Sequence, residues 1–157
     1  MISFSAVRPD AIPALAERLA LEDLTEISRR GWASPVDAIQ HSVSTSAEAF
    51  MASWNGEVQA VFGVVPLPGE RLEGEPAIGV PWLLSAAPPP CLQMEFMGRA
   101  EDVVARWRRT FPVLVSSVDA ERTRARRWLV SLGFTAQTTQ HYNGFPFTSV
   151  WTPAAYV

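Results

Sequence analysis

Apolar residues alternate along some stretches of this chain and recur every three or four positions along others, and these two periods predict its strands and helices. The clearest stretch reads FPVLVSSVDAERTRARRWLVSLGF. Within it, residues 112–118 form a β-branched run typical of a buried strand, and Asp119 stands where a helix N-cap belongs. Leu129 and Leu132 then repeat on one helix face, and Gly133 supplies the left-handed position that ends a helix.

The remaining elements follow from the same two periods. A helix at residues 21–30 has Leu21, Leu24 and Ile27 on its apolar face, and Ser34 resembles the N-cap of another helix. A further helix begins at Pro9, strands are predicted at residues 2–7, 49–54, 57–65, 77–86, 134–141 and 145–151, a loop at 67–76 and a long helix at 92–110.

Two kinds of local signal sharpen this outline. Asn55-Gly56 and Asn143-Gly144 predict tight hairpin turns, because both central residues of a type I′ turn need a positive φ. Pro81 interrupts its strand, and since proline cannot donate to a ladder it implies an edge, a bulge or a splayed strand pair. Alternation in the first hairpin predicts one buried face, made of Phe50, Ala52, Trp54, Val58, Ala60, Phe62 and Val64.

Composition limits the class of protein. A chain of 157 residues is expected to form one domain, residues 1–157. Cys91 is its single cysteine, so an internal disulfide is excluded, a reducing compartment fits and no metal site is expected. Lysine is absent, which excludes Schiff-base chemistry and a phosphate-loop lysine. Without a long apolar run or the features of a signal peptide, the chain is expected to be soluble, unsecreted and without a membrane partner.

Charge is unevenly distributed. Residues 99–127 hold eight arginines against four acidic residues, while the chain as a whole carries a net charge of −3. A basic face of this kind could meet a phosphate-bearing ligand, nucleic acid or an acidic protein. Two solvated helix faces that pair with their own acids are the preferred explanation. Overall acidity and the lack of lysine argue against nucleic acid.

Few side chains are candidates for catalysis. The chain's imidazoles belong to His41 and His141, and each could act as a general base or lie exposed without a role. Glu95 could also be a base, although an acid in the first turn of a helix simply complements the helix dipole. Tyr142 could donate a proton or be a half-buried hairpin aromatic. Cys91 could be a nucleophile at a helix N-terminus, but the sequence identifies no base partner for it.

The order of these elements, together with Ala125 and the Leu132-Gly133-Phe134 ending of its helix, resembles the fold of the GCN5-related N-acetyltransferases (GNATs). The resemblance implies one α+β or α/β domain: a mixed, mostly antiparallel sheet of about seven strands, a splayed fourth and fifth strand, and helices on both faces. More narrowly, WNGEVQAVFGV, GVPWLLSA, FPVLVSSVDA and RRWLVSLGF resemble small GNAT-like phage proteins related to the internal virion protein of short-tailed phages.

In that fold acetyl-CoA lies between the splayed strands, with its pyrophosphate on the turn before the next helix. The resemblance puts Pro81 in the fourth strand, and the free amides of the following helix are expected to face an anion. It therefore implies cofactor-binding roles for Trp82, Leu83, Leu84, Leu92, Gln93, Met94 and Arg122.

Two departures from the family pattern bear on activity. The phosphate turn contains three successive prolines, residues 88–90, in place of glycines, and prolines have no N–H to offer. Leu129 stands where many members have the tyrosine that protonates the CoA thiolate, and Arg122 where they have an asparagine. An aliphatic side chain cannot act as a general acid.

The sequence therefore leaves two main hypotheses. In the leading one the chain is a phage or prophage protein of the host cytoplasm or virion, contacting other virion or host proteins through its arginine-rich helices, with degenerate or absent acetyl-CoA chemistry and no cofactor. The alternative is an active acyl-CoA-dependent N-acetyltransferase of unknown amine substrate, using acetyl-CoA with Glu95 or His141 as base. Nucleic-acid binding ranks third.

Overall fold

The computed structural model describes residues 1–69 and 72–152 of the chain. Part of the loop predicted at 67–76 therefore falls on residues 70 and 71, outside the described residues. The elements in chain order are β1 (Ser3–Ala6), a 3₁₀ turn η1 (Pro9–Ala11), α1 (Ile12–Glu17), α2 (Leu21–Arg29), α3 (Pro35–Thr45), β2 (Glu48–Trp54), β3 (Glu57–Pro66), β4 (Ile78–Ser85), α4 (Pro90–Thr110), β5 (Val113–Asp119), α5 (Thr123–Ser131), β6 (Thr135–Tyr142) and β7 (Phe145–Trp151).

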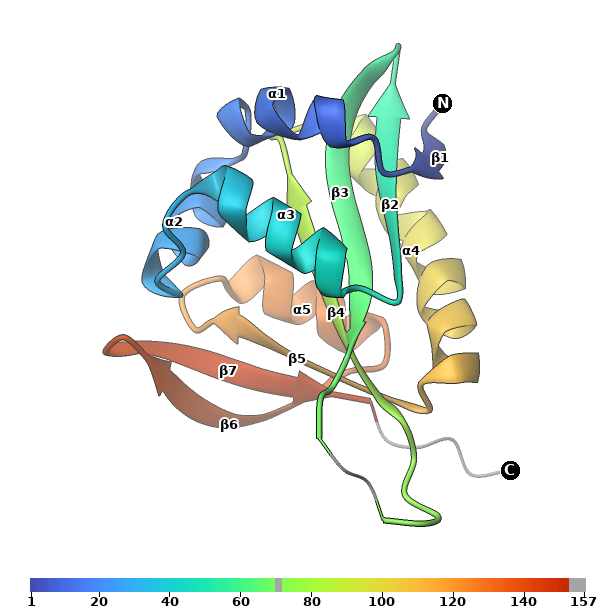
Figure 1. Ribbon diagram of the computed structural model, residues 1–157, viewed down its shortest axis with the longest axis vertical. Helices are drawn as coiled ribbons and strands as arrows, with labels where there is room; N and C mark the ends of the chain where they lie inside the picture. Colours follow the sequence, from blue (N-terminus) through green and yellow to red (C-terminus); the bar gives the residue numbers. More distant parts are fainter. Residues whose placement is uncertain (70–71, 153–157) are drawn as a thin grey trace.

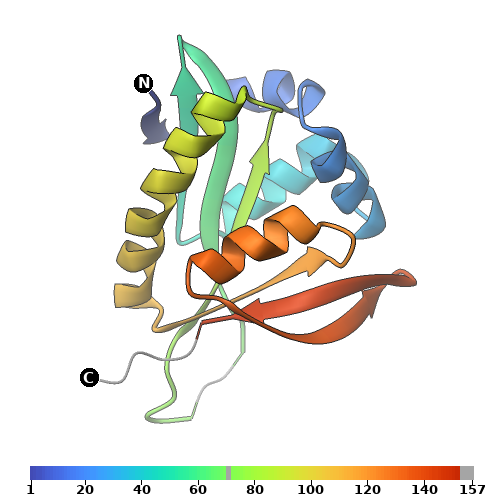
Figure 2. The same cartoon turned by 180° about the vertical axis from the view of Figure 1, so that it is seen from behind.

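The strands form one seven-stranded sheet in the order β1-β2-β3-β4-β5-β7-β6. All neighbours are antiparallel except β4 and β5, which run parallel. Helices α1, α2 and α3 cover one face of the sheet (Figure 1), and α4 and α5 cover the other (Figure 2). The predicted fold class, a mixed and mostly antiparallel sheet with helices on both faces, is confirmed.

Both predicted hairpin turns are present. Asn55 and Gly56 join β2 to β3 with φ of 51° and 76°, and Asn143 and Gly144 join β6 to β7 with φ of 51° and 82°. Asparagine and glycine tolerate this left-handed backbone, which gives the turn the same twist as its strands. The predicted cap of α3 is also confirmed, because the hydroxyl of Ser34 accepts the N–H of Asp37 at 3.1 Å.

Strands β4 and β5 are splayed, which is one of the three outcomes that Pro81 left open. Strand β4 pairs with β3 from Gly79 to Ser85 but with β5 at two positions alone, Ile78 opposite Val113 and Gly79 opposite Leu114. Beyond Gly79 the two parallel strands diverge. The parallel pair therefore has a closed end near Gly79 and a wide end near the end of β4.

The sheet separates two apolar cores, which corrects the prediction of one buried face on the first hairpin. Phe62 and its alternate neighbours pack against α4 and α5, as expected. Met51 and Val61, which point the other way, have 0% of their surface exposed and pack under α1 and α3. Val58 joins this second core as well, because a register shift at residues 52 and 53 reverses the alternation. Helices on both faces bury both sides of the sheet.

Two further predictions at helix ends are wrong. Asp119 is the last residue of β5, and Arg122 occupies the N-cap position of α5. The Asp119 carboxylate instead accepts the N–H of Glu121 within the connecting turn, so the helix begins later than the sequence indicated. Leu21 is 77% exposed, because it is the first residue of α2 and lies outside the packed face. Within the described residues, no helix has the length and hydropathy needed to cross a bilayer.

Candidate functional site

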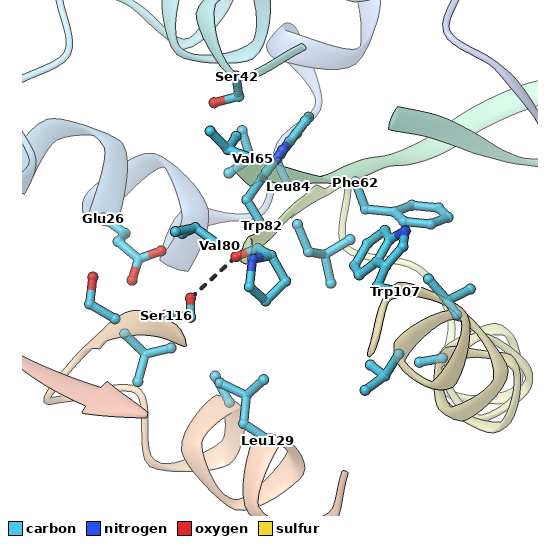
Figure 3. A pocket seen from close by; sticks show the side chains of 18 of the residues that line it. Glu26, Ser42, Phe62, Val65, Val80, Trp82, Leu84, Trp107, Ser116 and Leu129 are labelled. Atoms are coloured by element: carbon cyan, nitrogen blue, oxygen red, sulfur yellow. Dashed lines mark hydrogen bonds between the residues drawn. The ribbon is translucent and has the colours of Figure 1, made fainter. Parts of the chain in front are cut away.

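The space between the splayed halves of β4 and β5 is a cavity of about 430 Å³, called the slot below. Its strand walls are residues 80–84 of β4 and 116–118 of β5. Trp32 and His41 line it on the α3 side of the sheet, whereas Val104 of α4 and Leu129 of α5 line it on the other side. The slot therefore passes through the sheet (Figure 3).

The β4 edge of the slot presents backbone polar groups to its interior. The hydroxyl of Ser116 donates to the carbonyl oxygen of Pro81 at 3.2 Å, so this carbonyl faces β5. In a strand, the N–H and C=O of one residue point to the same neighbour, and the next residue but one repeats that direction. The nitrogen of Pro81, which carries no hydrogen, therefore faces the slot, so its pairing with β3 loses no hydrogen bond. Leu83 presents its own N–H and C=O to the slot. An extended ligand could pair with this edge.

A pair of charged side chains lies beside the wide end of the slot, on its α2 side. Nη1 of Arg122 lies 3.0 Å from Oδ1 of Asp23, and Oδ2 of Asp23 accepts the N–H of Ser85 at 2.9 Å. Asp23 is 3% exposed. Burial raises the pKa of its carboxyl above the ordinary value, although the Ser85 N–H and Arg122 oppose this. Asp23 thereby joins α2 to the end of β4 and the start of α5.

Hydrogen bonds of Glu26 and of three arginines extend this network along β5. The two carboxylate oxygens of Glu26 accept the N–H of Asp119 at 2.9 Å and Nη1 of Arg122 at 3.2 Å. Nη2 of Arg30 donates to the carbonyl and hydroxyl oxygens of Ser117. The hydrogen bond from Arg29 to Asp119, 2.7 Å long, raises the pKa of Arg29. The carboxylates that face the slot are therefore matched by cations or backbone donors.

A second cavity of about 720 Å³ lies beside the turn from β4 to α4. The amides expected to be free at the start of α4 are not free: the N–H groups of Leu92 and Gln93 both donate to the carbonyl of Pro89, at 3.0 and 3.1 Å. This carbonyl stands at the N-cap and takes the first helical bonds. The Gln93 side chain donates to the carbonyl of Pro88 at 2.8 Å. Opposite this turn the cavity is lined by Thr123 and Arg124.

The structure brings together part of the predicted site. Of the cofactor-binding candidates, the slot is lined by Trp82, Leu83, Leu84 and Arg122, and the second cavity by Leu83, Leu92, Gln93 and Arg122. Met94 is 74% exposed on α4 and lines neither cavity.

The catalytic candidates lie elsewhere. Glu95 accepts the N–H of Ile2 at 2.8 Å, tying α4 to the first residues of the chain. His141 and Tyr142 lie at the end of β6, where the Tyr142 hydroxyl donates to Gln140. None of these three lines the slot or the second cavity. His41 does line the slot, its ring 5.1 Å from that of Trp32.

Several slot residues had no signal in the sequence. Glu26 reads as an ordinary helix-surface acid, and Ser116 and Ser117 read as polar positions in a strand. The contacts of Glu26 with Asp119 and Arg122 join residues more than ninety positions apart. Such pairings follow from how α2 packs across the end of β5, which no local pattern records.

No protein-family model matches this chain, and neither does any curated protein. Solved structures do match. The Escherichia coli ribosomal-protein-S18-alanine N-acetyltransferase is 18% identical, with a TM-score of 0.63 over 100% of this chain and 96% of that one. Aminoglycoside acetyltransferase AAC(6')-Ib, in complex with ribostamycin and coenzyme A, is 14% identical, with a TM-score of 0.70 over 96% and 92%.

A GNAT-family acetyltransferase from Streptococcus agalactiae is 13% identical, with a TM-score of 0.61 over 96% of this chain and 94% of that one. These identities are low, but each match spans almost the whole of both chains. The structural likeness therefore extends over the whole fold. This chain has the GNAT acetyltransferase fold.

Proposed function

We propose that this protein binds a CoA thioester in the slot and transfers the acyl group to an amine. The observation that carries the proposal is the open slot between β4 and β5, with the backbone edge of Pro81 and Leu83 turned into it. A pantetheine arm is an extended chain with amide groups, so it can pair with such an edge as an added strand would. The similar aminoglycoside acetyltransferase was solved with coenzyme A.

The reaction is direct acyl transfer. The amine nitrogen attacks the thioester carbonyl carbon, the C–N bond forms, the C–S bond breaks, and sulfur leaves as a thiolate. The amine loses one proton and the thiolate gains one, so the products are an amide and free CoA. Leu129 cannot supply that proton, and solvent entering through the slot delivers it instead. The protein contributes mainly by holding the two reactants together in the slot.

The nucleotide end of the cofactor has the second cavity available to it. Because the turn before α4 offers prolines and two committed amides, this chain gives phosphates fewer backbone donors than a glycine-rich turn would. Arg124 brings a positive charge to this cavity, whereas Arg122 is already paired with Asp23 and Glu26, and Glu22 and Glu121 line the cavity as well. We expect binding through the slot with a weakened contribution from the pyrophosphate.

Thermal unfolding with added CoA and acetyl-CoA tests the proposal. A ligand at about a hundred times its Kd stabilises a protein by roughly 2.7 kcal/mol, which raises the Tm of a domain of this size by roughly 5–10 °C. Pantothenate, which lacks both the thiol arm and the nucleotide, serves as the control. An unchanged Tm with saturating CoA and acetyl-CoA overturns the proposal.

Turnover can be followed by the thiol that the reaction releases. Cys91 is free and exposed, so a thiol reagent would report it together with the product. The assay therefore uses Cys91→Ser, with a panel of amines and acetyl-CoA. Amine-dependent thiol release supports acyl transfer, whereas binding without release under every amine limits the protein to thioester binding.

A second candidate is the virion-associated or host-interacting protein without CoA chemistry. The turn of prolines before α4 favours this candidate, because the N–H groups of Leu92 and Gln93 donate to the carbonyl of Pro89 and are not available to a phosphate. Its partners would meet arginines that remain exposed on the two helices, such as Arg109 and Arg127. This candidate predicts no Tm shift with CoA and co-purification with phage particles, and a clear CoA-dependent shift counts against it.

A further inference from the structure

The inner part of the slot is walled by hydrocarbon. The walls come from β4, α4 and α5, and Figure 3 shows Leu129 and Trp107 on the two helices with the hollow between them. We call this part the apolar chamber and define it by Leu83, Val103, Val104, Trp107, Leu129 and Leu132. Five of the six are half-buried rather than buried, so their apolar surface faces open space.

The chamber lies toward the closed end of the slot. Helix α4 ends at Thr110, and two residues later β5 begins at Val113, which pairs with Ile78. Val103, Val104 and Trp107, in the last turns of α4, therefore stand beside the closed end. That end is filled, because a Cβ on Gly79 would lie 2.8 Å from side-chain carbons of Phe111 and Val64.

The chamber walls are also held in place. Nε1 of Trp107 donates to a carboxylate oxygen of Glu48 at 3.0 Å, which fixes the indole plane. Trp107 is itself buried and lies 6.3 Å from Phe62, ring centre to ring centre. A wall anchored in this way keeps the hollow from collapsing around smaller contents.

The charged side chains lie toward the opposite end. Glu26, Arg30 and Arg122 line the slot near Ser117 and Asp119 of β5, and every α4 or α5 side chain lining the slot beyond Arg122 is apolar. A ligand lying along the slot would meet ions at one end and hydrocarbon at the other. An acyl thioester fits this arrangement, with its polar pantetheine arm along the edge of β4 and its acyl chain at the hydrocarbon end.

We infer that the chamber receives the acyl chain and that the preferred donor is a medium-chain acyl thioester rather than acetyl-CoA. This inference rests on the proposed function and names its donor class. Water in contact with the half-buried leucine and valine side chains is unfavourable, and a hydrocarbon chain would replace it. Each methylene moved from water into an apolar site tightens binding about fourfold. An acetyl group is too short to bury methylenes in the chamber, so it does not gain this affinity.

Calorimetric titration of the intact protein with CoA, acetyl-CoA and octanoyl-CoA tests the inference. We expect octanoyl-CoA to bind at least tenfold more tightly than acetyl-CoA. Equal or weaker binding of octanoyl-CoA overturns the inference while leaving the proposed function standing. If none of the three binds, the proposed function itself fails. Free octanoate binding as tightly as octanoyl-CoA would mark a fatty-acid site and also overturn the inference.

Variants that fill the chamber make the test specific. Leu129→Phe and Val104→Phe each add volume inside it, and Val130→Phe adds the same ring to a side chain that is 50% exposed and lines neither cavity. Both filling variants should cut the octanoyl-CoA advantage to threefold or less while acetyl-CoA affinity changes less than threefold. Val130→Phe should keep the full advantage. If both filling variants fold and still bind octanoyl-CoA with the full advantage, the acyl chain lies elsewhere and the inference is wrong.

Discussion

Arg122 forms an ion pair of 3.0 Å with Asp23, a carboxylate that also accepts the backbone N–H of Ser85 at 2.9 Å. One buried aspartate thus links α2, the end of β4 and the start of α5. The pair therefore connects the end of β4 to the turn that follows β5, beside the wide end of the slot. Arg122, which stands where the resemblance led us to expect an asparagine, therefore has a structural role of its own.

Removing Arg122 should destabilise the fold. Arg122→Met leaves the buried charge of Asp23 without its cation, and breaking a largely buried pair from one side costs about 2–4 kcal/mol. Urea unfolding measures the loss. Arg127→Gln, an exposed arginine on the same helix, should stay within about 0.5 kcal/mol of the parent. A loss below about 1 kcal/mol for Arg122→Met would show that the pair does not hold the slot together.

Asp23 should make stability depend on pH. Burial raises its folded pKa above the unfolded value of about 3.9, so the folded state binds the proton more tightly than the unfolded state. Below about pH 3.9 Asp23 therefore makes its full contribution to the stability of the folded state. That contribution is lost as the pH rises through the folded pKa of Asp23. Asp23→Asn cannot ionise. Between pH 4 and 7, the Tm of the parent should fall relative to that of Asp23→Asn; a relative rise contradicts the assignment.

Gly79 should resist enlargement. Its missing side chain makes room for Phe111 and Val64 where the slot closes, and a Cβ there would lie 2.8 Å from carbons of both. Gly79→Ala should therefore cost about 1–3 kcal/mol through overpacking. Gly98→Ala in α4 meets nothing within 4 Å and should instead stabilise by about 0.5–1 kcal/mol. Thermal unfolding of the two variants compares them directly, and equal effects would contradict the packing argument.

Restoring backbone donors to the phosphate turn should tighten cofactor binding. Pro88→Gly combined with Pro89→Gly adds two N–H groups where the chain now has none. If the pyrophosphate lies there, acetyl-CoA should bind roughly three- to tenfold more tightly, the gain being reduced by the flexibility of glycine. Acetyl-pantetheine, which lacks the diphosphate, should gain nothing. The same improvement for both ligands would place the pyrophosphate elsewhere.

The slot between β4 and β5 shows how much of the strand pairing a single proline can predict. Pro81 implied an interrupted pairing because a proline cannot donate to a neighbouring strand, and β4 does separate from β5 beyond Gly79. The sequence offered three outcomes for this proline: an edge, a bulge or a splay. The choice among them depended on which side of β4 the ring faces, and the Ser116 contact with its carbonyl reveals that side.

The sequence predicted the residues of the candidate site less well than it predicted the fold. Leu83, Leu84 and Trp82 were expected at the slot because the resemblance to the GNAT fold put them in its fourth strand, and they line it. Glu95 and His141 were chosen for their chemical type, and they lie away from both cavities. Chemical type says what a side chain can do, whereas its distance from the slot depends on packing between elements far apart in the chain.

Local rules located the strands, helices and turns, although not the start of α5, since periodicity, proline and Asn-Gly pairs act within a few residues. They also sufficed to show that Leu129 cannot donate a proton. The tertiary structure alone decided which groups meet: that Asp23 and Glu26 of α2 reach Arg122, that the amides of Leu92 and Gln93 are taken by Pro89, and that a hydrocarbon chamber opens behind β4. The reason is physical, because burial and pairing arise when distant segments pack, and their free energies belong to no single segment.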